Sequence, residues 1–158
     1  MKEKVGILTI NDDSNCGNRL QNYAVQEILK NCNVKPVTIV NLVNSNDNNY
    51  LKARLKRLIR VTFLWPLPKY QKAISFDKFN LKIKRALKVI KNEKDAEKIQ
   101  KKYKTFFVGS DQVWNPCFNR TSPIDFLTFA TENKRNSFSA SFGISKIPTE
   151  KDEGLTTC

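Results

Sequence analysis

The sequence has no histidine among its 158 residues, and this absence excludes several kinds of catalytic site. Ser-His-Asp and Cys-His arrangements need an imidazole as general base, so this chain alone can form neither. The four cysteines form no CxxC pair, which argues against a zinc site. A G-x-G-x-x-G fingerprint is also absent, and we therefore predict no NAD or FAD.

Long hydrophobic runs are lacking too, since none approaches the roughly 20 residues that cross a bilayer. The first residues carry no secretory pattern and lead directly into an apolar run from Val5. We therefore expect a cytoplasmic location. At 158 residues with 40% hydrophobic composition, the chain is long enough for one domain with its own core.

Acidic residues are scarce, with 15 against 28 Lys and Arg, for a net charge of +13. Residues 51–104 hold 18 Lys and Arg against four acidic residues, so the remainder of the chain is close to neutral. A basic segment could bind nucleic acid, but interleaved aromatic residues are sparse there and no known motif is present. Nucleic acid is therefore the less favoured partner.

Four apolar runs predict the strands of a mostly parallel sheet. They are residues 5–10, 37–42, 105–109 and 137–142. Apolar residues at helical spacing predict helices that begin near residues 20, 51, 73 and 93. The third is expected to extend to about residue 90, and a break near Asn80 is the alternative. Strands that alternate with helices indicate an α/β fold, and we expect a three-layer Rossmann-like domain.

The helix that begins at Leu51 is basic and amphipathic, with Trp65 shortly after it. Such a helix can pack on its own domain with a solvated polar side. It can also lie in a membrane interface. Both interpretations stay open, and residues 51–65 are a candidate peripheral membrane contact.

The composition changes abruptly after the third predicted strand, where small and hydrogen-bonding residues follow an apolar run. Gly109 permits a turn with positive φ and a close backbone approach. Trp114 offers an apolar wall. Hydrogen-bonding groups come from Ser110, Asp111, Gln112 and Asn115. These residues could bind a ligand, or they could form an ordinary capped turn.

A second polar turn follows the first strand, and its candidate binding residues are Asn15, Gly17 and Asn18. Carboxyl ends of parallel strands meet at one edge, so we expect Ser14 to Asn18 to face Asp111 across a cleft. Asp111 is the candidate catalytic base, and the alternative is a carboxylate that caps backbone N–H groups.

Three stretches together resemble the polysaccharide pyruvyl transferase family: GSDQVWN from Gly109, NCGNRLQNYA from Asn15 and SFSASFG from Ser137. The resemblance implies a transferase whose donor substrate is phosphoenolpyruvate. It would transfer the pyruvate unit to a sugar of a cell-surface polysaccharide or its precursor, where the unit forms a ketal. The reaction implies no further cofactor. The resemblance adds Ser141 and Gly143 to the candidate substrate-binding residues.

The resemblance also implies a two-domain fold like that of GT-B glycosyltransferases. We expect residues 1–143 to form its N-terminal Rossmann-like domain, with a basic helical insertion at about 44–104, and residues 144–158 to form an irregular tail. On this hypothesis the chain is a truncated, acceptor-side half that is inactive alone, and a second chain supplies the other half. The alternative is a non-catalytic remnant that binds a sugar or a partner.

Overall fold

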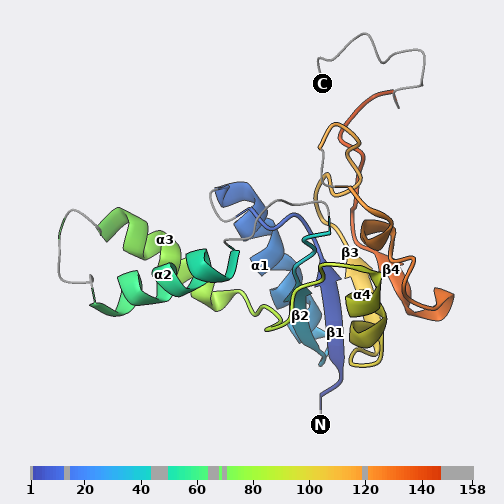
Figure 1. The fold of residues 1–158 in the computed structure, drawn as a ribbon, viewed down its shortest axis with the longest axis horizontal. Helices are drawn as coiled ribbons and strands as arrows, with labels where there is room; N and C mark the ends of the chain where they lie inside the picture. Colours follow the sequence, from blue (N-terminus) through green and yellow to red (C-terminus); the bar gives the residue numbers. More distant parts are fainter. Residues whose placement is uncertain are drawn as a thin grey trace.

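The structure is a computed structural model that describes residues 2–12, 15–43, 50–63, 68, 71–118 and 121–146. Its centre is a four-stranded sheet in the order β2-β1-β3-β4 (Figure 1). The strands are β1 (Lys4–Leu8), β2 (Lys35–Ile39), β3 (Thr105–Val108) and β4 (Arg135–Ser137). All three strand pairings are parallel, so the predicted α/β class with a parallel sheet is confirmed.

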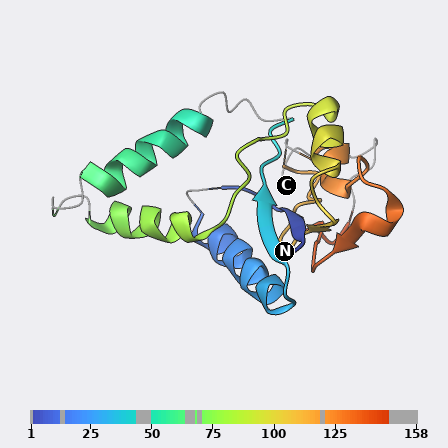
Figure 2. The same cartoon turned by 90° about the horizontal axis from the view of Figure 1, so that it is seen from below.

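Helices cover both faces of the sheet (Figure 2). On one face, Val25 and Leu29 of α1 (Cys16–Asn31) pack with Val5 and Ile7. On the other face, α4 (Glu93–Gln100) contributes Ala96 and Ile99 to a core that includes Phe106. Because apolar side chains point to both faces of the strands, the sheet is buried on both sides, as three layers require.

The fourth strand is shorter than predicted, since β4 ends at Ser137 and residues 138–142 are not strand. The physical reason is at Ser139, whose φ of 51° turns the chain out of extended geometry. The segment then runs along residues 109–114, where Ser141 N donates to Asp111 O at 3.0 Å. Trp114 N donates to Ser141 O at 3.3 Å.

The helix predicted from residue 73 does not extend to residue 90, because α3 spans Gln71–Lys82 and so ends close to the break that the sequence suggested near Asn80. Residues 83–90 instead run beside β2, and Thr38 N donates to Lys84 O at 2.8 Å. Gln26, fully buried on α1, holds this segment through two hydrogen bonds with the Lys84 backbone, at 2.8 and 3.0 Å. The segment thus pairs backbone groups that an open sheet edge would leave unpaired.

Helices α2 (Tyr50–Phe63) and α3 pack against each other and project from the sheet layers (Figure 1). The projecting part is therefore narrower than the expected insertion at about 44–104, because residues 83–90 and α4 belong to the sheet layers. Residues 44–49 and Trp65 lie outside the described residues, as does the tail after residue 146. Within the described ranges, no helix combines the length and apolar character needed to cross a membrane.

Candidate functional site

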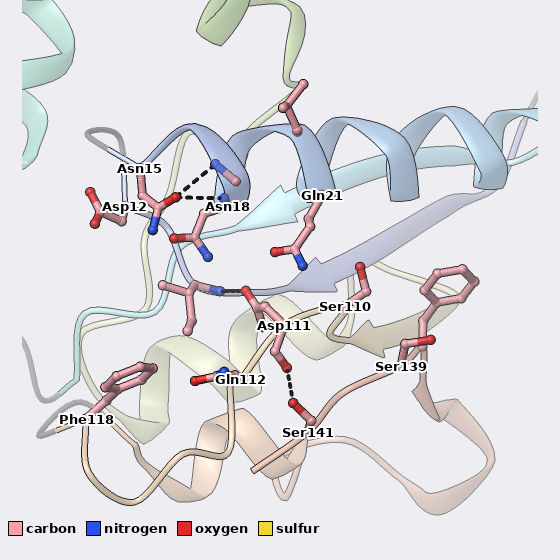
Figure 3. A pocket seen from close by; sticks show the side chains of 14 residues that line it. Asp12, Asn15, Asn18, Gln21, Ser110, Asp111, Gln112, Phe118, Ser139 and Ser141 are labelled. Carbon is pink, nitrogen blue, oxygen red and sulfur yellow. Dashed lines mark hydrogen bonds between the residues drawn. The ribbon is translucent and has the colours of Figure 1, made fainter. Parts of the chain in front are cut away.

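A cleft of about 1340 Å³ lies at the carboxyl edge of the sheet, where β1 and β3 end and α1 begins (Figure 3). It forms there because β1 is central and delivers its loop beside the loop after β3. The cleft is lined by Ile10, Asp12, Asn15, Gly17, Asn18, Leu20, Gln21, Ser110, Asp111, Gln112, Phe118, Phe138, Ser139 and Ser141.

The lining mixes polar and apolar side chains, and its only charged groups are acidic. Amides and hydroxyls predominate, with two carboxylates from Asp12 and Asp111, and the side chains of Asn18 and Gln21 point from α1 towards the loop after β3 (Figure 3). Among the described residues of the lining there is no Lys or Arg, although the whole chain carries a net charge of +13. Such a surface suits a neutral ligand with many hydroxyl groups better than a phosphate.

Asn15 is the N-cap of α1. Its side-chain oxygen accepts from Gly17 N at 2.9 Å and from Asn18 N at 3.3 Å (Figure 3). These bonds occupy two of the first helix amides, which would otherwise be available to an anion. Asn15 therefore shapes the edge of the cleft, and Asn18 and Gln21 present side chains to it. Ser14 lies outside the described residues.

Asp111 joins the loop after β3 to the residues that follow β1. Its side chain is 7% exposed, and Oδ2 accepts from Ile10 N at 2.8 Å and from Thr9 Oγ1 at 2.5 Å. The second oxygen, Oδ1, is buried and makes no hydrogen bond with any described residue. The carboxylate lies at the carboxyl edge of the sheet, as expected, but its contacts are those of the capping alternative.

Two of the predicted site glycines, Gly109 and Gly143, lie too close to neighbouring atoms to carry a side chain. Gly109 has φ +107°, and a Cβ there would lie 2.3 Å from Phe138 O. Gly143 has φ +66°, and a Cβ there would lie 2.2 Å from Gln112 Cδ. Both positions therefore need glycine for conformation and for space. Neither residue lines the cleft, but each lies against a residue that does.

Trp114 and Asn115 also lie behind the lining. The Trp114 ring stacks on Phe126 with centroids 5.5 Å apart, and its Nε1 donates to Asp125 O at 2.9 Å. Asn115, only 5% exposed, donates from Nδ2 to Gln112 Oε1 at 3.1 Å. Trp114 therefore packs the loop after β3, and Asn115 positions Gln112.

Sequence reasoning missed several residues of the cleft. Phe118, 39% exposed, is an aromatic side chain of the lining, a role that the sequence suggested for Trp114. Asp12, Gln21 and Ser139 were also missed. Gln21 could have been found, because it follows Asn18 by three residues and so lies on the same side of α1. Phe118 gave no comparable local signal.

Tyr103, whose hydroxyl has a shifted pKa, lies away from the cleft. Burial raises the pKa of the Tyr103 hydroxyl above its usual value of 10.0. Tyr103 precedes β3 and packs against Phe106 with ring centroids 5.6 Å apart, so it belongs to the opposite, amino end of that strand. This tyrosine therefore contributes to the core.

We expect Gly143→Ala to lower the melting temperature by roughly 2–12 °C and to displace Gln112. The positive φ and the overlap with a flexible side chain together cost roughly 1–3 kcal/mol. Thermal unfolding measures the first effect. The second is a shift of the Gln112 side-chain amide signals in a ¹H–¹⁵N spectrum, and unchanged signals would show that Gln112 does not depend on this glycine.

The chain matches no protein family, no curated protein and no solved structure in comparisons of its sequence and fold. The class is therefore defined by the structure: a Rossmann-like α/β domain with a polar, cation-free cleft in the described part of its carboxyl edge.

Proposed function

We propose that this chain provides the acceptor-binding half of a polysaccharide pyruvyl transferase-like protein and that its cleft holds a sugar. The observation that carries the proposal is the lining: amide and hydroxyl side chains with an exposed aromatic ring, and no Lys or Arg among its described residues. Amides and hydroxyls bind sugar hydroxyls, and an aromatic ring packs on the apolar face of a sugar.

The proposed reaction joins one phosphoenolpyruvate and two sugar hydroxyls. A proton adds to the enol carbon, the two hydroxyl oxygens bond to the neighbouring carbon and lose their protons, and the bond from that carbon to the phosphate oxygen breaks. The products are a cyclic ketal and inorganic phosphate. The phosphate and carboxylate of the donor need cations, which the described lining does not offer. The proposal therefore assigns donor binding to groups outside this cleft, on a second chain or domain.

The two carboxylates receive different roles. Asp111 is buried and uses one oxygen to hold Thr9 and Ile10, so we assign it a positioning role. Asp12 lines the same cleft and is only half-buried, which places a carboxylate where an acceptor hydroxyl can reach it. A base must lie within hydrogen-bond distance of the proton that it removes. Asp12 therefore replaces Asp111 as our candidate base.

Saturation-transfer NMR with the chain tests sugar binding. We expect transfer to methyl glycosides of glucose, galactose or mannose, and none to phosphoenolpyruvate. The double variant Asn18→Ala/Gln21→Ala should weaken sugar binding by about fivefold or more, because it removes two hydrogen-bonding side chains. Gln71→Ala, an exposed glutamine on α3 outside the cleft, is the matched control and should bind as the unaltered chain does.

Binding of phosphoenolpyruvate without sugar binding would contradict the acceptor-side assignment. Sugar binding by a chain that gives no pyruvyl transfer with any donor-binding half would support the alternative, a non-catalytic sugar-binding protein. The buried Asp111 is compatible with both, because a positioning carboxylate serves binding and catalysis alike.

A further inference from the structure

Helix α2 presents large apolar side chains to solvent. Leu55 is 59% exposed, Leu58 50%, Ile59 46% and Phe63 72%. Their spacing of three and four residues places them on one side of the helix, which we call the α2 face. Contiguous exposed apolar side chains commonly mark an interaction surface.

The orientation of α2 is fixed by its arginines, which point the other way. Arg57 Nε lies 2.9 Å from Asp77 Oδ1, and Arg60 Nη1 lies 3.2 Å from Asp77 Oδ2. The Asp77 side chain is 8% exposed, and Arg54 donates to Ala86 O at 3.4 Å. Turning the α2 face inward would leave this buried carboxylate unpaired, which is costly. Helix α2 thus turns Arg57 and Arg60 towards Asp77 of α3 and exposes its large apolar side chains.

Exposed lysines lie on both helices of the α2–α3 pair, which we call the hairpin. Lys52 and Lys56 are exposed on α2, and Lys72 and Lys82 are exposed on α3. Among the described residues of these two helices, Asp77 is the only acidic one, and Arg57 and Arg60 pair with it. The solvent-exposed side of the hairpin is therefore apolar and cationic.

We propose that the α2 face docks on the surface of a membrane that contains anionic phospholipids. The apolar side chains enter the boundary between headgroups and acyl chains, and the lysines contact the headgroups. The helix has 14 residues, about 21 Å, and lies flat on the surface. In Figure 2, α3 lies between α2 and α1, so α2 is the outer helix of the projecting hairpin. A bound nucleic acid would place phosphates against aliphatic side chains, which favours lipid.

The proposal stands independently of sugar binding, because the hairpin and the cleft share no residue. It is tested by sedimentation of the chain with vesicles of phosphatidylcholine alone and of phosphatidylcholine with about 30% phosphatidylglycerol. We expect sedimentation with the anionic vesicles, at least tenfold weaker partitioning to neutral vesicles, and release as salt rises.

Two variants separate the contributions of charge and hydrocarbon. Lys52→Glu/Lys56→Glu should reduce binding to anionic vesicles by about tenfold or more. Leu55→Gln/Leu58→Gln/Ile59→Gln should reduce it by a similar factor. The matched controls are Lys101→Glu/Lys102→Glu, exposed beyond α4, and Leu87→Gln, whose side chain is 85% exposed outside the hairpin. Both controls should bind normally, and circular dichroism confirms that each variant is folded.

Equal sedimentation with neutral and anionic vesicles would overturn the proposal, as would normal binding by the two α2 variants. If no vesicle sediments the chain but labelled duplex DNA does, and the Lys52→Glu/Lys56→Glu variant loses that binding, the face binds nucleic acid. If neither lipid nor DNA binds, the lipid proposal is equally wrong.

Discussion

Gly109→Ala is expected to lower the melting temperature of the domain by roughly 6–20 °C. A non-glycine residue at φ +107° is strained, and its Cβ would lie 2.3 Å from a backbone oxygen, that of Phe138. Because backbone cannot rotate away as a side chain can, residues 138–141 must move from the loop after β3. Strain and overlap together cost about 3–5 kcal/mol, and each kcal/mol lowers the melting temperature by about 2–4 °C at this size.

Gly17→Ala is the matched control for Gly109→Ala. Gly17 also borders the cleft, but it lies in α1, and the nearest atom to an added Cβ is Asn15 Oδ1 at 3.2 Å. Alanine favours helix over glycine by about 0.5–1 kcal/mol. The melting temperature should therefore stay the same or rise slightly. Equal losses in the two variants would show that the close approach at Gly109 does not stabilise the fold.

Asp111→Ala should lower the melting temperature by about 4–24 °C. The substitution removes the acceptor of Ile10 N and Thr9 Oγ1, both at the buried end of β1. Each buried donor left unpaired costs about 1–3 kcal/mol, and each kcal/mol corresponds to about 2–4 °C. Differential scanning calorimetry measures the shift.

Asp111→Asn and Thr9→Val separate the parts of this effect. Asparagine keeps an oxygen for Ile10 N and an amide that can donate to the Thr9 hydroxyl, so its loss should be smaller than that of alanine. Thr9→Val removes only the hydroxyl and should also cost less. If Asp111→Asn were as stable as the unaltered chain but abolished pyruvyl transfer in a reconstituted two-half enzyme, the positioning role would be wrong and Asp111 would be the base.

The order of strands and helices could be predicted well from local patterns. The runs near Val5, Val37 and Phe106 have apolar residues at consecutive positions and not only at every second one. Such runs are typical of a sheet that is covered on both faces. Element boundaries were less predictable. The residues after Lys82 have helical apolar spacing, yet they extend along β2, because its edge supplies hydrogen-bond partners that no local pattern reveals.

The sequence likewise determined only part of the candidate site. The sequence by itself identified the two polar turns that meet in the cleft, because strand ends and helix starts are encoded locally. Only the tertiary structure decided which side chains enter the cleft. It buried Asp111 against Thr9, packed Trp114 on Phe126 and brought Phe118 to the lining.

For the basic helix α2, too, the sequence determined one part and the tertiary structure another. Its amphipathic pattern was evident from the sequence, but a pattern does not say which side faces the protein. The ion pairs of Arg57 and Arg60 with Asp77 decided that, and Asp77 lies 20 residues from Arg57 along the chain. Composition and periodicity determine which elements form. Contacts between residues distant in the sequence determine which of their side chains remain exposed to bind something else.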